Sequence, residues 1–265
     1  MESWAERWGM RFNAKKCYTL SVKQKTSYFY QLNKTILQEV DSNPYLGVII
    51  SKDLQWTKHI DKITKKANST LGFIKRNLKH APQNSKRLAY ISLVRSTLEY
   101  AAVVWDPYKQ GDINKLERTQ RHAARFITRD YKSKHEGCVR GMLRKLGLPD
   151  LQDRRMEKRL VMLYKIVGGM VPAMKADAFL TPIKSKRKIR TTKFKDCDTK
   201  NIIDTYQTNN NKCYKVDSFN TEVYKNSFFV KTVCDWNTLN DRIVGAETVS
   251  SFSTAVQERT RQLGP

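Results

Sequence analysis

The stretch WTKHIDKITKKANSTLGFIKRNL, residues 56–78, decides the fold class of this chain. Its apolar side chains recur every three or four residues, which is the spacing of one face of an α-helix. They are Trp56, Ile60, Ile63, Ala67, Leu71, Ile74 and Leu78. Most other positions are polar or basic, so the stretch predicts an amphipathic helix of about six turns whose apolar face lies in a core.

Similar spacings follow after Pro82, which ends this helix. Apolar residues over 88–105 predict a second helix that closes before Pro107, and Asp112 is expected to cap a third helix that runs to about residue 129. A short helix over 143–146 and a longer one over 156–167 are each followed by glycine. Two C-terminal helices are predicted from the apolar residues Phe229, Val233 and Trp236 and from Phe252, Val256 and Leu263.

The segments before residue 56 have a different pattern. Residues 2–9 predict the end of a helix, and residues 18–22, 27–32 and 45–50 predict strands, with a turn at Asn33-Lys34 between the last two. We therefore expect an α+β protein that is mostly α, with a short N-terminal antiparallel sheet followed by a helical bundle and a helical C-terminal region.

Charge is the strongest global feature of the composition. The chain has 50 Lys and Arg residues against 25 Asp and Glu residues, a net charge of +25. Such an excess repels itself in a compact fold unless a polyanion neutralises it, which favours nucleic acid as a partner first and an anionic membrane second. The alternative is a basic protein with a solvated surface. It is less favoured because the excess runs through nearly every segment.

The sequence predicts neither a membrane span nor a bound metal. The longest apolar run, Tyr100 to Trp105, has six residues, whereas a span needs about 20, and the N-terminus does not have the pattern of a signal peptide. The five cysteines are odd in number and lack Cys-x-x-Cys spacing, and the four histidines complete no zinc pattern. We expect free thiols in an intracellular compartment, nuclear or cytoplasmic, and no metal or cofactor in this chain.

Three further stretches, taken in order, resemble a known family. They are WAERWGMRFNAKKC (4–17), YLGVIISKDLQWTKHI (45–60) and LEYAAVVWDPY (98–108). Together they resemble the C-terminal part of reverse transcriptases from non-LTR retrotransposons of the jockey-like kind. Later pairs also match that pattern, among them Arg154-Arg155, Arg159-Leu160, Tyr164-Lys165, Phe228-Phe229 and Trp236-Asn237.

The resemblance implies an organisation for the chain. It assigns 1–55 to the end of the polymerase palm with a primer-grip-like hairpin, 56–130 to thumb-like helices and 131–181 to a helical connector. The composition marks 182–218 as a basic flexible segment and 219–265 as a C-terminal helical region. The tryptophans Trp4 and Trp8 are then expected to pack on palm and fingers elements that lie upstream of this chain.

The resemblance also implies which chemistry is missing. Such enzymes bind Mg²⁺ at an aromatic–Ala–Asp–Asp turn, because two-metal phosphoryl transfer needs neighbouring carboxylates. This sequence has no Asp-Asp pair, and Asp196-Cys197-Asp198 lies in a basic block without a strand around it. We expect a fragment that retains nucleic-acid binding and has no polymerase activity by itself.

Site residues follow from the matched motifs. Lys16 matches a lysine near the incoming nucleotide and is expected to be vestigial here, or one solvated lysine among many. Tyr45, Leu46 and Gly47 match the hairpin that holds the primer end, where Gly47 would let a nucleic-acid backbone approach closely. The alternative is that Tyr45 and Leu46 are simply core.

The expected phosphate contacts are long cations on rigid helix faces, although the same residues are what any solvated polar face would carry. On the helices they are Lys58, Lys62, Lys65, Lys66, Lys75, Arg76, Arg118, Arg121 and Arg125, and in the basic block Lys184, Lys186, Arg187, Lys188 and Arg190. The expected partners are RNA and DNA, bound without sequence specificity.

A different class of function stays open. The chain could be a domesticated helical adaptor that binds protein partners through apolar patches that a palm would otherwise cover. Amphipathic faces turned outward would favour the adaptor, and a basic groove between the hairpin and the helices would favour nucleic acid. A decayed element without a selected function is a third possibility.

Overall fold

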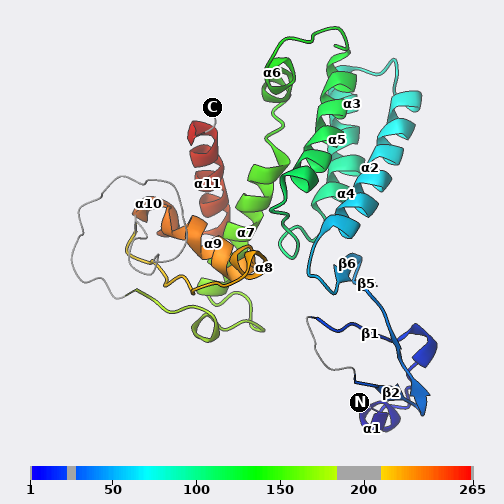
Figure 1. Ribbon diagram of the computed structural model, residues 1–265. Helices are drawn as coiled ribbons and strands as arrows, with labels where there is room; N and C mark the ends of the chain where they lie inside the picture. Colours follow the sequence, from blue (N-terminus) through cyan, green and yellow to red (C-terminus); the bar gives the residue numbers. More distant parts are fainter. Residues whose placement is uncertain (1, 23–27, 184–209, 264–265) are drawn as a thin grey trace.

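The computed structural model describes residues 2–22, 28–183 and 210–263. It is mostly helical, as the sequence predicted. In place of the expected antiparallel sheet, the described N-terminal residues form three separate two-stranded pairs, one of which is parallel. Figure 1 shows three parts: an N-terminal module, a bundle of long helices, and a C-terminal group of helices beside the bundle. Among the described residues, none of the helices combines the length and apolar character that crossing a bilayer requires.

The N-terminal module contains helix α1 (Glu2–Arg7), the 3₁₀ turn η1 (Ala14–Lys16) and short strands. Strands β1 (Tyr18–Thr19) and β4 (Gln38–Glu39) form a parallel pair, and β2 (Gln31–Leu32) and β3 (Thr35–Ile36) form an antiparallel hairpin. Asn33 and Lys34 make the expected turn, with φ of 49° and 61°. The expected strand over 18–22 is only two residues long, because just Tyr18 and Thr19 pair, and of the described residues in the expected strand over 27–32 only Gln31 and Leu32 pair.

A third strand pair joins the module to the bundle. Strands β5 (Ser42–Tyr45) and β6 (Val48–Ser51) are antiparallel, with Tyr45 opposite Val48. The run 45–50 was expected to be one strand, but it is the end of one strand, a two-residue turn and the start of the next. The resemblance placed a hairpin at Tyr45, Leu46 and Gly47, but the β-rich pattern alone predicted one strand, because the turn places Leu46 at positive φ, which leucine rarely adopts.

The bundle is built on the helix that the opening stretch predicts. Helix α2 (Thr57–Asn77) buries Ile60, Ile63, Ala67, Leu71 and Ile74 as expected. It packs against α5 (Gln110–Thr128) and against the segment that comprises α3 (Gln83–Ala89), the π-helix η2 (Tyr90–Arg95) and α4 (Ser96–Glu99). Helix α6 (Cys138–Lys145) closes one end of the bundle.

The second predicted helix differs from expectation in its length and in its buried face. It ends at Glu99, and Ala101 has a φ of 51°, so Ala102 and Trp105 reach the core from a loop. Leu88 was expected to point inward but is exposed. The π-helical segment explains this change, because its wider turn rotates the buried face onto residues spaced by four. These are Tyr90, Val94 and Leu98.

The C-terminal group surrounds α7 (Leu151–Val167), which belongs to both halves of the molecule. Leu151 at its start lies in the bundle core, and Leu160 and Leu163 lie in a second core. The second core is completed by α9 (Phe228–Asn237), α10 (Asp241–Val244) and α11 (Val249–Leu263), with α8 (Glu222–Lys225) and the 3₁₀ turn η3 (Ala176–Ala178) at its edge. The bundle core therefore extends along the chain as far as Leu151.

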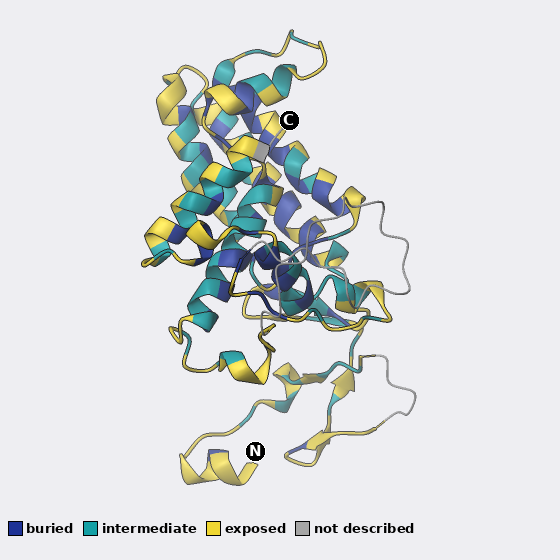
Figure 2. Cartoon of the chain, turned by 90° about the vertical axis from the view of Figure 1, so that its left-hand side faces the viewer, coloured by how far each residue is buried: buried dark blue, intermediate teal, exposed yellow. Residues whose placement is uncertain are grey.

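The distribution of burial separates the three parts. Figure 2 shows dark blue interior faces in the helical parts and mostly yellow residues in the N-terminal module. Among the described residues up to Tyr45, only Ala5 and Leu32 are buried hydrophobic residues. The helical parts therefore have extensive cores of their own, whereas the described part of the module has two buried apolar side chains.

Most of the segment expected to be flexible, 182–218, lies outside the described residues, and with it the whole basic block from Lys184 to Lys195. Its described end is well packed. Asn210, expected in a polar loop, is buried and donates hydrogen bonds to the carbonyls of Trp236 (3.1 Å) and Leu239 (3.0 Å).

Candidate nucleic-acid interface

The tip of the β5–β6 hairpin is exposed, and its two turn residues have positive φ. Leu46 and Gly47 form a two-residue turn with φ of 47° and 88°, the signs that the hairpin turn of type I′ requires at both positions. Tyr45 is 64% exposed and Leu46 is 75% exposed. The alternative that these two residues belong to the core is therefore wrong, and an apolar tip projects from the surface.

Gly47 has a neighbour that the sequence did not predict. A Cβ built on Gly47 would lie 3.1 Å from Cε1 of Tyr100, and the Tyr100 hydroxyl donates a hydrogen bond to the carbonyl of Leu46 (3.1 Å). The close approach that we expected from a nucleic-acid backbone is thus made by the ring of Tyr100. Glycine is needed at this position both for its φ and for this contact.

Two residues of α2 hold the base of the hairpin. Lys58 donates from Nζ to the hydroxyl of Ser42 (3.2 Å), and the backbone N–H of Ile49 donates to Nδ1 of His59 (3.3 Å). His59 is buried and lies edge-to-face with Trp105, with 5.0 Å between ring centroids. Trp105 is fully buried, in agreement with its expected place in the core.

The state of His59 follows from this environment. Burial, with a smaller effect from the charge of Lys62, lowers its pKa from 6.5 to about 4. The ring is therefore neutral near pH 7, with its proton on Nε2 because Nδ1 accepts from Ile49. Sequence reasoning assigned His59 no role, and no local pattern around it could have shown that it supports the hairpin.

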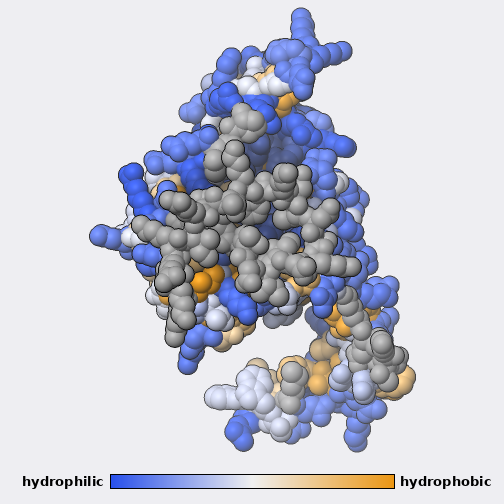
Figure 3. Space-filling model, turned by 60° about the vertical axis from the view of Figure 1, so that its left-hand side comes forward, coloured by the Kyte–Doolittle hydropathy of each residue, from blue (hydrophilic) through white to orange (hydrophobic). Residues whose placement is uncertain are grey.

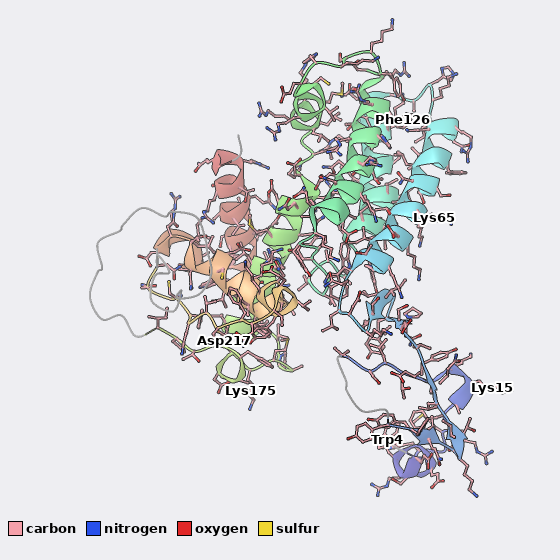
Figure 4. All side chains as sticks on the ribbon, in the orientation of Figure 1. Trp4, Lys15, Lys65, Phe126, Lys175 and Asp217 are labelled. Atoms are coloured by element: carbon pink, nitrogen blue, oxygen red, sulfur yellow. The ribbon has the colours of Figure 1, made fainter. Side chains whose placement is uncertain are left out.

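The outer face of α2 is strongly basic. Lys58, Lys62, Lys65, Lys66 and Arg76 are exposed and Lys75 is half-buried. At 100° per residue, Lys58, Lys65 and Arg76 fall within about 20° of one another around the helix axis. Figure 4 shows Lys65 on α2.

The negative charge on this face is small and already paired. Asp61 is the only acid in α2, and its carboxylate lies 2.6 Å from Nζ of Lys115 on α5. The same Nζ is 3.4 Å from Asp112, which was expected to cap α5. The helix begins earlier, at Gln110, so Asp112 lies in its first turn and instead accepts a hydrogen bond from Thr57 (2.7 Å).

Helix α5 continues the basic face with Arg118 and Arg121, which are both exposed. Burial and then the charges of Lys75, Arg118, Arg121 and Arg125 lower the pKa of His122, which lies among them. Cations from two helices therefore act on one ring. The structure brings Lys75 of α2 together with the arginines of α5, which spacing alone could not establish.

Arg125 has a different place from the one that we expected. Its guanidinium donates to the carbonyls of Asp130 (3.2 Å) and Ser133 (2.9 Å), so it supports the loop after α5. Arg129, the residue directly after α5, donates in the same way to the carbonyls of Lys79 and Ala81. Their donors are engaged with backbone, which leaves Arg118 and Arg121 as the exposed arginines of this helix.

Lys16 is exposed at the end of η1 in the N-terminal module. Figure 4 shows the neighbouring Lys15 and also Trp4 in this module, away from α2. No group of three or more His, Cys, Asp or Glu residues that could hold a metal ion occurs in the described part of the chain.

The module also carries an exposed apolar surface. In Figure 3, pale and orange atoms gather on the module at the lower right of the view. Its large exposed side chains include Trp4, Trp8, Tyr28, Phe29, Tyr30 and Ile36. Side chains of this kind over so small a core mark a surface for association.

Comparison with known proteins gives weak but consistent similarities. The probable RNA-directed DNA polymerase from transposon BS of Drosophila melanogaster is 23% identical over 135 residues, which are 48% of this chain and 15% of that protein. The RNA-directed DNA polymerase from mobile element jockey of the same organism is 25% identical over 134 residues, 48% of this chain and 14% of that protein. The probable RNA-directed DNA polymerase from transposon X-element, again of Drosophila melanogaster, is 22% identical over 132 residues, with 47% and 14% covered.

No protein-family model matches the sequence, and no solved structure matches it. The chain therefore has a reverse-transcriptase-related region, and the match spans only 14–15% of the length of these curated relatives.

Proposed function

We propose that this chain binds RNA and DNA through the outer face of α2 and α5, as a thumb-like part of a reverse-transcriptase-related protein that grips a template–primer duplex. The observation that carries the proposal is the charge of this face. Helix α2 has six Lys and Arg residues and one acid, Asp61, which Lys115 neutralises. Long cations on a rigid helix are suited to phosphate contacts, which carry no sequence information.

The similarity to RNA-directed DNA polymerases supports nucleic acid as the polyanion that this charge meets. The hairpin adjoins the proposed surface, because Lys58 belongs to the basic outer face of α2 and also donates a hydrogen bond to Ser42 of the hairpin. In the proposed complex, Tyr45 and Leu46 contact the end of the duplex while the α2 cations follow its backbone. The basic block from Lys184 to Lys195, outside the described residues, is proposed to capture nucleic acid non-specifically.

We propose no catalysis by this chain alone. Phosphoryl transfer with two metal ions needs closely spaced carboxylates, and the sequence has no Asp-Asp pair. The polymerase activity named for the relatives would then belong to a longer protein in which an upstream palm and fingers segment supplies the catalytic residues and binds Mg²⁺. The exposed aromatic side chains around Trp4 and Trp8 are the proposed docking surface for that segment.

The same aromatic surface supports a second candidate function, that of a protein-interaction adaptor without nucleic-acid contact. The helical bundle does not support it, because the apolar face of α2 is turned into the bundle core. The adaptor proposal therefore rests mainly on the N-terminal module, with a smaller contribution from exposed apolar side chains of the bundle such as Phe73, Leu88 and Leu93.

The two candidate functions predict different effects of removing cations from α2 on the binding of RNA. We expect Lys62→Gln/Lys65→Gln/Lys66→Gln to weaken binding of the full chain to a hairpin RNA and to its scrambled counterpart equally, by fluorescence anisotropy. The matched control is Lys175→Gln/Lys215→Gln/Lys225→Gln, which removes the same charge from the C-terminal group. Equal losses in both triple variants would show a response to net charge only, and absence of binding by the folded wild type would favour the adaptor.

A further inference from the structure

Glu99, the last residue of α4, is a buried carboxylate that holds the bundle to α7. Its side chain is 8% exposed and lies between cations of two helices. Arg154 of α7 donates to both carboxylate oxygens, and Lys158 of α7 lies 2.9 Å from Oε2. Arg95, one turn before Glu99, is 3.9 Å away. The position of the end of α4 is thus fixed by two residues of the C-terminal half.

The backbone of the next residue, Tyr100, is held by hydrogen bonds to the carbonyl before it and to its own carbonyl. Lys158 also donates to the carbonyl of Glu99 (3.4 Å), and the indole N–H of the buried Trp105 donates to the carbonyl of Tyr100 (2.8 Å). The chain leaves the helix here, with ψ of Tyr100 at 128° and a left-handed Ala101. The backbone of Tyr100 therefore has little freedom although its side chain is 58% exposed.

The side chain of Tyr100 then reaches the hairpin tip. Its hydroxyl bonds the carbonyl of Leu46, and its ring covers the face of Gly47. The base of the hairpin has its own supports on α2, through Lys58 and His59. In contrast, the tip holds a leucine at positive φ, a conformation that costs about 1–2 kcal/mol and persists only where the surroundings impose it.

We propose that Glu99 and Tyr100 are positioning residues through which α7 sets the place of the hairpin tip. Arg154 and Lys158 fix Glu99, Glu99 fixes the backbone of Tyr100, and the Tyr100 side chain fixes Leu46 and Gly47. The C-terminal half then controls a surface element that it does not cover. The consequence for nucleic-acid binding rests on the proposed function, whereas the mechanical link does not.

The link has a spectroscopic signature at Gly47. A proton on a glycine that faces an aromatic ring at van der Waals distance has its resonance shifted by the ring current. The chain has 11 glycines, so selective labelling of glycine gives an NMR spectrum simple enough to follow Gly47 in the full protein. A residue that only stabilised the fold would leave this shift unchanged in every variant that stays folded.

Two variants test the two steps. Tyr100→Phe keeps the ring and removes the hydroxyl, and Arg154→Gln/Lys158→Gln releases Glu99 without touching Tyr100. We expect both to reduce the ring-current shift of Gly47, with the other glycine signals of the bundle retained. The controls are Tyr131→Phe, a tyrosine of similar exposure (57%) in the loop after α5, and Lys225→Gln, which removes an exposed ion pair with Glu222.

An unchanged Gly47 signal in the folded Arg154→Gln/Lys158→Gln variant would overturn the proposal. If that variant does not fold, Lys158→Gln alone decides: it leaves Arg154 on the Glu99 carboxylate but removes the bond to the Glu99 carbonyl, which is joined directly to Tyr100. A smaller reduction of the Gly47 shift is then expected, and an unchanged signal overturns the proposal. RNA affinity of the same variants is measured separately by anisotropy. A wild type that binds no RNA refutes the proposed function, while the Gly47 signal still decides the mechanical link.

Discussion

Replacing Asp106 with asparagine removes the charge that joins the bundle to the C-terminal core. Asp106 lies in the loop between α4 and α5, and its side chain is 8% exposed. It contacts three cations: Arg155 and Arg159 of α7, each at 3.0 Å, and Lys231 of α9 at 2.6 Å. The two arginine side chains are 0% and 4% exposed, so water cannot take over the role of the carboxylate.

The magnitude follows from leaving the buried Arg155 without the carboxylate that it pairs with, while Arg159 keeps its pair with Asp235 (2.9 Å). Breaking a buried ion pair by removing one member typically costs about 3–5 kcal/mol, and asparagine retains one acceptor oxygen, so we expect about 3 kcal/mol. At about 2–4 °C per kcal/mol for a chain of this size, the Tm of Asp106→Asn should fall by roughly 6–12 °C. Burial alone would raise the pKa of Asp106, but Arg159 and Lys231 outweigh it and lower the pKa. This stabilisation is present above the ordinary aspartate pKa and is lost as the pH falls through the lowered folded value.

The assay is thermal unfolding followed by circular dichroism, with urea unfolding as a second measure. The matched control is Glu222→Gln, which breaks an exposed pair with Lys225 (3.8 Å) and should cost at most about 0.5 kcal/mol. A Tm of Asp106→Asn that equals that of the control would refute the reasoning. So would a loss of the same size on replacing Lys231 alone, since Asp106 would still contact both arginines.

Further outcomes are expected from other parts of the chain. Folding lowers the pKa of His59 from 6.5 to about 4, so the folded state favours the neutral ring. The contribution of His59 to stability is therefore complete above pH 6.5. It decreases as the pH falls toward 4, by up to about 3 kcal/mol. Urea midpoints at pH 7 and pH 5 should show this loss in the wild type and not in His59→Asn. Trp4→Ser/Trp8→Ser should reduce binding of a hydrophobic dye and light scattering, and a wild-type monomer that binds no dye would contradict the exposed surface. On a primed RNA template with Mg²⁺ or Mn²⁺, the chain alone should extend no primer; extension that a substitution in this chain abolishes would contradict this prediction.

The helices were predictable where local periodicity determines burial. The buried face of α2 follows the apolar spacing of residues 56–78 directly, and Gly168-Gly169 marks the end of α7. The π-helix η2 was not predictable, because the apolar residues in this part of the sequence fit the spacing of an α-helix equally well. The pattern of apolar residues also missed the turn at Leu46-Gly47, which only the resemblance implied, since its leucine adopts a φ that tertiary contacts impose.

The candidate site was predictable only in its charge. Lysines on the outer arc of α2 follow from helical spacing, but Arg155 and Arg159 resemble a solvated face in the sequence and are in fact buried. Their partner Asp106 lies about 50 residues earlier in the chain, and such long-range pairing has no local signal. The same holds for Tyr100, whose contact with the hairpin joins segments 54 residues apart.

The central claim is that the described helices bind the phosphate backbone, and the salt dependence of binding tests it most directly. Each phosphate that a cation neutralises contributes about −0.9 to the log–log slope of affinity against salt for duplex. We predict that Lys62→Gln/Lys65→Gln/Lys66→Gln makes the slope for a hairpin RNA shallower by about 2–3, measured by fluorescence anisotropy from low to moderate salt, while the triple variant in the C-terminal group leaves it nearly unchanged. Binding that does not depend on salt, or an unchanged slope in the α2 variant, would contradict the account.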